Sequence, residues 1–321
     1  MTTTALTGLD LRIATALQVD PRAPWRRIAR VLDEPERTVA RRGQALLADG
    51  VVEVAAVRIL AESALVRVQC APGAVRVAAE SLAQRADTTF AYAATGGADC
   101  VVELVCGPGR LRSVLVNEIP ATVGMARAHT YPILRYFRTI REWTAGALTP
   151  EQRAALHPSP GPDLDGMDPT YTQPSAVDAL VAEALVADGR AGVEAVARRA
   201  GVSETTAARR ISALIAERRL QIRALVEPAD VGLPVEALLW ITASPGRVDQ
   251  LGRALAEDPR TRYAVAVAGD HQIVADVTCR TNQELYELVT GSDWVHLAGS
   301  VDATLVLHAR KRGGRFRPWV G

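Results

Sequence analysis

Apolar residues between positions 177 and 185 recur at the spacing of one face of an α-helix. The positions i, i+3, i+4, i+7 and i+8 are held by Val177, Leu180, Val181, Ala184 and Leu185. A second short helix is expected over 191–201, where Gly201 suits the left-handed conformation found just beyond helix ends. Ser203 is typical of an N-cap and predicts a third helix that continues through Leu214. Three helices with a short glycine-containing turn before the last one predict a helix-turn-helix module.

The same pattern occurs 168 residues earlier in the chain. Residues 9–49 align with residues 177–217 without a gap, which indicates a duplicated module. The first copy therefore predicts helices over 9–18, 24–32 and 36–48. Pro35 stands where Ser203 caps the third helix of the second copy, so the two caps are expected to differ.

A larger pattern follows each three-helix module. Apolar strand-like runs and helix-like segments come in the order β-α-β-β-α-β, which is the ferredoxin-like arrangement. The first copy has these segments at 64–70, 72–84, 89–95, 100–106, 110–119 and 126–137, and the second at 237–242, 246–258, 261–268, 272–279, 282–291 and 300–309. We predict an α+β protein in which a winged or three-helix helix-turn-helix domain precedes a ferredoxin-like domain, with the whole unit duplicated. The open face of such a sheet needs a partner, usually another sheet of the same kind.

The predicted domain boundaries follow from these patterns. The expected segments are a helix-turn-helix domain over 1–60, a ferredoxin-like domain over 61–143, a linker over 144–173, a second helix-turn-helix domain over 174–235, a second ferredoxin-like domain over 236–313 and a basic tail over 314–321. Most of the segment 148–175 is rich in Pro, Gly and Asp, which is typical of a linker. The arginine-rich end of the chain predicts either contact with DNA phosphates or a disordered terminus.

Composition narrows the class of protein. The 321 residues are 48% hydrophobic and 23% charged, which is typical of a soluble globular chain. No apolar run is long enough to span a membrane, and the first residues lack a signal-peptide pattern, so we expect a cytoplasmic protein with no membrane partner. Cys70, Cys100, Cys106 and Cys279 lack zinc-site spacing, so we expect free thiols, no metal site and no cofactor.

Positive charge is concentrated in the helix-turn-helix modules. The net charge of the chain is only +1, yet residues 22–42 and 190–219 each hold seven arginines against three acidic residues. The third helix of such a module enters the major groove of double-stranded DNA, where its polar residues meet bases and phosphates. The predicted DNA-binding residues are Arg37, Thr38, Arg41, Arg42 and Gln44 in the first copy and Ser203, Thr205, Thr206, Arg209 and Arg210 in the second. The alternative is a solvated Arg/Glu face on a three-helix core.

The order of modules resembles the leucine-responsive/asparagine-regulator (Lrp/AsnC) family of transcriptional regulators. The segments that carry the resemblance are "RTVARR", "TTAARR", "LVEPADVGLP", "ATGGADCVVEL" and "VAGDHQIVADV". The resemblance implies sequence-specific DNA binding that an amino acid or another small effector modulates. Family members usually carry one copy and dimerise through the sheet domain, so this chain is similar to a tandem fusion. The resemblance implies a homodimer, and hence a pseudo-tetramer, or a higher assembly.

The same resemblance implies two effector sites near the loops that join the second and third strands. Those residues are Thr95, Gly96, Gly97 and Asp99 in one loop and Ala268, Gly269, Asp270 and Gln272 in the other. Both loops depart from the usual Thr-Gly-Asp-Tyr-Asp pattern of the family. The alternative for each loop is a tight hairpin that needs glycine.

An enzyme of the same architecture is the other alternative. The architecture of the chain is also similar to that of siroheme decarboxylases. That resemblance implies an acid/base pair of histidines near the second strand. Here the second copy has only His271 at the end of that strand, the first copy has none, and His129 and His308 lie on the last strands. We therefore predict a regulator with no catalytic residues rather than an enzyme.

Overall fold

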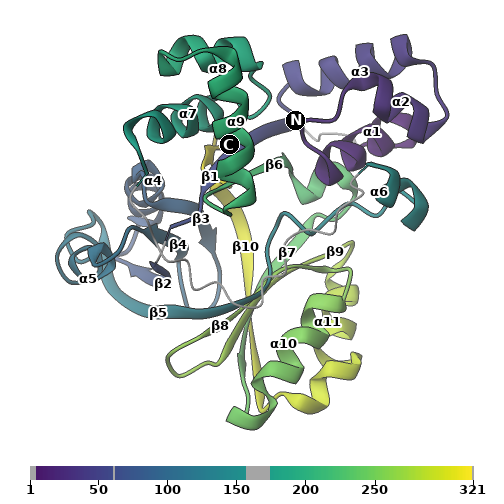
Figure 1. Ribbon diagram of the computed structural model, residues 1–321. Coiled ribbons are helices and arrows are strands. Elements are labelled where there is room, and N and C mark those ends of the chain that lie inside the picture. Colours follow the sequence, from purple (N-terminus) through teal and green to yellow (C-terminus); the bar gives the residue numbers. More distant parts are fainter. Residues whose placement is uncertain (1–4, 61, 157–173, 320–321) are drawn as a thin grey trace. The chain divides into compact units, whose positions relative to one another are not determined.

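The computed structural model describes residues 5–60, 62–156 and 174–319. These residues form two compact units (Figure 1). The first unit holds residues 5–60, 144–156 and 174–231, and the second holds residues 62–143 and 232–319. Each unit therefore combines the corresponding modules of the two repeats.

The first unit contains two three-helix modules. The first copy forms α1 (Gly8–Val19), α2 (Trp25–Leu32) and α3 (Glu36–Ala48), and the second forms α7 (Ala176–Ala187), α8 (Val193–Ala200) and α9 (Glu204–Ala216). All six helices were expected from the sequence. Their apolar faces join in one core, in which Ile13, Leu17 and Ile28 belong to the same cluster as Val181 and Leu185. The two modules are thus one hydrophobic body.

Two strands that the sequence patterns did not predict join the modules. Strand β1 (Val52–Arg58) pairs antiparallel with β6 (Leu220–Val226), and a short 3-10 turn, η2 (Pro228–Val231), follows. Val52 pairs with Val226 and Arg58 pairs with Leu220. Exchanging every residue with the one 168 positions away turns each of these pairs into the other. The ribbon therefore has a two-fold relation that matches the sequence repeat.

One helix lies inside the predicted linker. Helix α6 (Pro150–Leu156) begins with a capping box, because Thr149 Oγ1 accepts from Gln152 N at 3.2 Å and Gln152 Oε1 accepts from Thr149 N at 3.1 Å. Leu156 is fully buried in the core of the first unit. The Thr-x-x-Gln spacing is the signal that could have located this helix. Residues 157–173 of the predicted linker lie outside the described residues.

The second unit contains the strands and helices of the larger modules. The first half comprises β2 (Glu62–Cys70), α4 (Val75–Gln84), β3 (Thr88–Ala94), β4 (Cys100–Cys106), α5 (Arg110–Ser113), the π-helical turn η1 (Val114–Glu118) and β5 (Met125–Arg138). The second comprises β7 (Val235–Thr242), η3 (Pro245–Arg247), α10 (Val248–Glu257), β8 (Thr261–Val267), β9 (Ile273–Cys279), α11 (Asn282–Gly291), η4 (Asp293–Leu297), β10 (Ser300–Arg312) and β11 (Arg315–Phe316). The order of elements matches the sequence-based expectation.

The sheet itself differs from that expectation. Its strands run β11-β10-β3-β4-β2-β5-β8-β9-β7, and β7 pairs again with β10, so the sheet closes into a barrel. A duplicated ferredoxin-like arrangement with two separate open sheets is therefore not confirmed; the fold is a mixture of helices and strands with helix-turn-helix domains and a β-barrel. Closure depends on length, because β5 and β10 have 14 and 13 residues and each pairs with strands of both halves.

The barrel contains aromatic and charged side chains. Tyr92 and Trp240 are fully buried in a cluster distinct from those beneath the helices. A charged network lies near them, in which Arg312 donates to both carboxylate oxygens of Glu236 at 2.8 and 2.7 Å and Arg262 donates to Glu236 at 2.6 Å. Burial, together with the charge of Glu236, raises the pKa of Asp276 beside this network. The network satisfies charges that would otherwise be costly to bury.

Arginines near the end of the chain contact the barrel unit. Arg312 belongs to the buried network, and Arg310 Nη2 donates to Glu80 of α4 at 2.9 Å. Trp319 Nε1 donates to the same carboxylate at 3.2 Å, and its ring stacks on His308 with centroids 4.6 Å apart. Arg310 and Arg312 therefore bind within the barrel unit.

Candidate nucleic-acid interface

The third helix of each module, α3 or α9, is called its reading helix, because this is the helix expected to enter the major groove. Each reading helix buries one row of side chains and exposes another. The buried stripe is Val39, Gly43 and Leu46 on α3 and Ala207, Ile211 and Leu214 on α9. The exposed set includes Arg37, Arg41 and Gln44 on α3 and Thr205, Arg209 and Ser212 on α9. Thr38 and Thr206 are half-buried at the edge of this set. The exposed side chains are free to meet a ligand, as the DNA-binding prediction requires.

The N-terminal ends of the reading helices differ. Ser203 Oγ accepts a hydrogen bond from Thr206 N at 3.2 Å and so caps α9. Pro35 precedes α3 and provides no side-chain cap. Ser203, which the sequence assigned to DNA binding, therefore has a structural role that explains its presence.

The two neighbouring arginines of each reading helix have unequal surroundings. Arg42 Nη1 donates to both carboxylate oxygens of Asp10 on α1 at 3.0 Å. In the second copy Arg210 Nε donates to Asp178 Oδ1 on α7 at 2.6 Å, and this pairing lowers the pKa of Asp178. Arg41 and Arg209 are exposed instead. The second arginine of each pair ties the reading helix to its own module, whereas the first points outward.

Sequence reasoning missed these carboxylate partners although the signal was present. Asp10 and Asp178 occupy the same place in the repeat, as do Arg42 and Arg210. An acid and a base retained together in both copies is the pattern of an internal ion pair.

A reciprocal pair of arginines holds the two modules together. Arg22 donates to the carbonyl oxygens of Gly189 and Ala191 at 2.7 and 3.0 Å. Arg190, 168 residues later, donates to the carbonyl oxygens of Pro21 and Ala23 at 2.6 and 3.2 Å. Each contact is the counterpart of the other under the two-fold relation of the β1–β6 ribbon, so the reading helices are held as an equivalent pair.

Among the differences between the module cores is a pair of residues that exchange large and small side chains. In the first copy Trp25 lies against Gly43, where an added Cβ would be 2.3 Å from a ring carbon of Trp25. The corresponding residues of the second copy are Ile211, in the shared core, and Val193, which is partly buried against it. Gly43 is therefore required by the large ring of Trp25 beside it. In the second copy a smaller residue, Val193, replaces the ring and a larger one, Ile211, replaces the glycine.

The predicted effector loop of the first half lies against the last strand of the second half. Thr95 N donates to Leu305 O at 3.0 Å. An added Cβ on Gly97 would lie 2.2 Å from Nη2 of Arg67, which pairs with Asp302 at 3.2 Å. Asp99 Oδ2 accepts from Cys70 N at 2.7 Å. The loop is thus braced by the other half of the barrel, with a cation beside its glycine.

The loop of the second half makes the corresponding contact with different side chains. Ala268 N donates to Pro132 O on β5 at 2.9 Å, and Gly269 approaches the ring of Tyr131. His271 lies 3.2 Å from Asp270 and has its ring 6.0 Å from that of Tyr131. Gln272 Oε1 accepts from Ala243 N at 3.0 Å. The predicted residues are brought together within each loop, and the two loops are chemically unlike.

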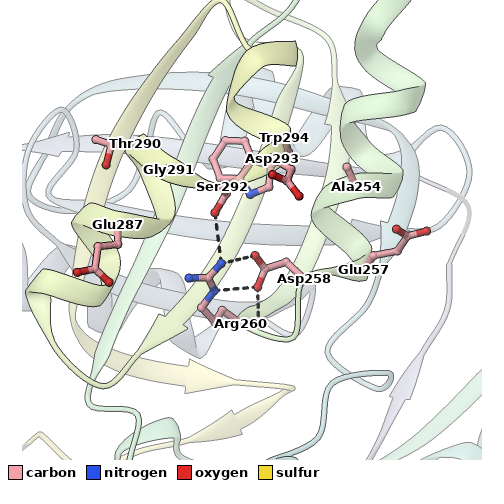
Figure 2. Close-up of a pocket in the computed structure, with 10 residues that line it drawn as sticks. All are labelled: Ala254, Glu257, Asp258, Arg260, Glu287, Thr290, Gly291, Ser292, Asp293 and Trp294. Carbon is pink, nitrogen blue, oxygen red and sulfur yellow. Dashed lines mark hydrogen bonds and ion pairs between the residues drawn. The ribbon is translucent and has the colours of Figure 1, made fainter.

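A cavity of about 610 Å³ lies elsewhere in the second half (Figure 2). Its lining comes from the ends of α10 and α11 and from η4, and none of the predicted effector residues is among the described residues that line it. Arg260 is held by Asp258 at 2.7 Å and by Ser292 at 3.2 Å, as Figure 2 shows. Glu257, Glu287 and Asp293 leave the lining acidic. No sequence pattern pointed to this cavity.

In residues 5–60, 62–156 and 174–319 no three His, Cys, Asp or Glu side chains gather to hold a metal ion. The four cysteines have free thiols, and Cys70 and Cys100 have sulfur atoms 4.0 Å apart. None of the helices within these ranges combines the length and apolar character needed to cross a membrane.

Comparison with known proteins identifies the modules. The AsnC-type helix-turn-helix domain matches residues 6–47 and 176–215. An uncharacterised HTH-type transcriptional regulator of Pyrococcus abyssi is 32% identical over 114 residues, which cover 35% of this chain and 72% of that protein. The HTH-type transcriptional regulator LrpA of Pyrococcus horikoshii is 23% identical over 114 residues, covering 35% of this chain and 81% of that protein.

A solved structure shares the fold over both repeats. The siroheme decarboxylase NirDL matches 95% of this chain and 93% of its own, with a TM-score of 0.59 and 13% identity. At that identity the likeness concerns the fold alone. The sequence relatives and the two domain matches decide the family: this chain belongs to the Lrp/AsnC family of helix-turn-helix transcriptional regulators and carries the AsnC-type domain twice.

Proposed function

We propose that the protein regulates transcription by binding double-stranded DNA in a sequence-specific manner through α3 and α9. The observation that supports this most is the equivalent placement of Arg41 and Arg209, both exposed on reading helices that the Arg22 and Arg190 contacts hold as a pair. An exposed arginine on such a helix binds phosphates or reads guanine. We propose the cytoplasm as the location of the protein.

The test is DNA affinity measured against salt concentration. A phosphate contact contributes about one to the slope of log affinity against log salt, so Arg41→Ala and Arg209→Ala should each lower that slope by about one. Arg280→Ala removes an exposed arginine of the barrel unit and serves as the matched control. Equal slopes for all three variants and the parent chain would show that Arg41 and Arg209 lie on a solvated helix face and do not contact DNA.

We propose further that the loops 95–99 and 268–272 bind an amino acid or a similar small effector. Both loops lie against the last strand of the other half, and Arg67 and Asp270 offer charges suited to a carboxylate and an ammonium group. Isothermal titration with a panel of amino acids tests this, with Arg67→Ala and Asp270→Asn as the loop variants. Binding that neither variant weakens would place the effector elsewhere.

The finer architecture is also a proposal. The strand orders β3-β4-β2-β5 and β8-β9-β7-β10 correspond to each other, so we treat the halves as ferredoxin-like repeats fused along their edges. The six segments predicted from the sequence are kept as domain boundaries on this view. Two such chains would present four helix-turn-helix modules. Light scattering with and without DNA measures the mass of the particle and so shows whether two chains associate.

Siroheme decarboxylation is the second candidate. The observation in its favour is the shared fold with NirDL over both repeats. His271 is a histidine of the second strand region, and it lies with its ring 5.9 Å from that of Trp240. Incubation with siroheme under reducing conditions, followed by mass spectrometry, tests this candidate; loss of carbon dioxide from siroheme would overturn the assignment as a regulator without enzymatic activity.

A further inference from the structure

The two reading helices occupy equivalent positions, yet they carry different side chains. Equivalence follows from two independent contacts. The β1–β6 register maps onto itself when residues 168 apart are exchanged, and so do the carbonyl contacts of Arg22 and Arg190. An ideal two-fold pair of identical helices would read an inverted repeat. Any departure from an inverted repeat must therefore come from the side chains.

Two of the side chains that the helices share suit the DNA backbone. Arg41 matches Arg209, and Thr38 matches Thr206. Arg42 and Arg210 also match, but their pairing with Asp10 and Asp178 holds them to their own modules. The two helices thus share one outward arginine and one threonine at the same helical positions, together with an exposed glutamate at their first position, Glu36 and Glu204.

The unmatched side chains are those that suit base edges. Arg37 on α3 corresponds to Thr205 on α9, and Gln44 corresponds to Ser212. All four are exposed. Arginine reads guanine and glutamine reads adenine with paired hydrogen bonds, whereas threonine and serine are too short for such a fork and accept several bases. Helix α3 can therefore discriminate at two positions where α9 cannot.

We propose that the operator of this protein is not palindromic and that the chain binds it in one orientation. The half-site under α3 specifies purines opposite Arg37 and Gln44, and the half-site under α9 is permissive at the two equivalent positions. The half-sites lie about one helical turn apart or a multiple of it. This inference rests on the proposed DNA binding. It adds a polarity: a protein that can lie only one way on the operator distinguishes the two flanking directions.

Selection from a random duplex library tests the proposal with three forms of the full chain. The parent chain should enrich a motif of two unequal halves. The double variant Arg37→Thr/Gln44→Ser should enrich an inverted repeat of the permissive half. The reciprocal variant Thr205→Arg/Ser212→Gln should enrich an inverted repeat of the purine-specific half. Each changes only exposed positions, so the two variants control for each other, and their melting temperatures should equal that of the parent.

Binding assays then measure the size of the effect. Replacing a specified purine in the α3 half-site should weaken the parent roughly 5- to 150-fold, and should not weaken Arg37→Thr/Gln44→Ser. A strict inverted repeat selected by the parent, or an unchanged motif in both variants, would overturn this inference while leaving sequence-specific binding intact. Enrichment of no sequence by the parent would overturn the proposed function and the inference with it.

Discussion

Arg210 forms a two-point ion pair with Asp178, a carboxylate with only 1% of its side chain exposed. The same relation occurs 168 residues earlier between Arg42 and Asp10, where both partners are more exposed. The pair joins the third helix of each module to the first. It also explains why a reading helix carries two neighbouring arginines, because only one of them is needed for the outward face.

Arg210→Ala should therefore lower stability and Arg209→Ala should not. Removal of Arg210 leaves a buried carboxylate with the hydroxyl of Ser175 as a remaining partner, at an expected cost of about 2–4 kcal/mol. Arg209→Ala changes an exposed position and should stay within about 0.5 kcal/mol of the parent. Urea unfolding measures both, and a double-mutant cycle with Asp178→Ala isolates the pair. Equal losses for the two arginines would contradict the division of roles.

The corresponding DNA measurements should show the opposite order. At a temperature where both variants are folded, Arg209→Ala should lower affinity for every sequence and reduce the salt slope, whereas Arg210→Ala should leave the slope unchanged. Filter binding at several salt concentrations provides the comparison. If the slope changed only for Arg210→Ala, then Arg210 and not Arg209 would contact the phosphate, which would contradict the prediction.

Replacing Gly43 by alanine should destabilise the first module despite the better helix propensity of alanine. The added methyl would lie 2.3 Å from a rigid ring carbon of Trp25, so the ring must move, at about 1–3 kcal/mol. The double variant Trp25→Val/Gly43→Ile copies the Val193 and Ile211 pair and should recover most of the loss. Thermal unfolding compares the three chains. A more stable Gly43→Ala chain would show that the ring of Trp25 can move aside without a loss of packing energy.

Loss of Arg22 or Arg190 should weaken DNA binding without changing its salt dependence. Each guanidinium holds two carbonyl oxygens of the opposite module, and burial lowers the pKa of both arginines. Arg22→Ala should therefore loosen the placement of the reading helices and lower affinity at least several-fold, with no phosphate contact removed. Arg22→Lys should recover little, because an ammonium group cannot fork between two carbonyls. A reduced salt slope in Arg22→Ala would indicate direct contact with DNA instead.

The stability of the barrel unit should fall in acid through Glu80. Hydrogen bonds from Arg310 lower the pKa of Glu80 to about 2 from its ordinary value of 4.5. Because the folded-state pKa lies below the unfolded value, this contribution is present above about pH 4.5 and is lost as the pH falls toward 2. The side chain is 32% exposed, so screening limits the effect to about 1 kcal/mol. Glu80→Gln should flatten the pH profile of unfolding; Glu287→Gln, at an exposed position of α11, should leave it unchanged.

The sequence was sufficient for elements whose signal is local. The spacing of Val177, Val181 and Leu185 predicted α7, and the repeat carried that prediction to α1. The range 126–137 predicted β5 to within one residue at each end. Glycine and serine at the ends of α8 and α9 marked the turn between them. Each of these signals lies within one turn or one strand of the residue that it places.

What the sequence did not predict depends on pairing between distant segments. Strands β1 and β6 pair with each other through backbone hydrogen bonds, and the sequence of neither strand indicates which strand it pairs with. Barrel closure likewise depends on the last strands continuing past their own half. The residues proposed to bind DNA lie on α3 and α9 or at the N-cap of α9. Arg42 and Arg210 could be told from Arg41 and Arg209 only by the position of Asp10 and Asp178 in space.

The strands β5 and β10 have a consequence for the integrity of the chain. Each is hydrogen-bonded along its length to strands of both repeats. A chain cut between the repeats would yield two fragments that stay associated and co-purify under native conditions, separating only in denaturant. Dilution cannot dissociate the halves of the intact protein, because one chain carries both.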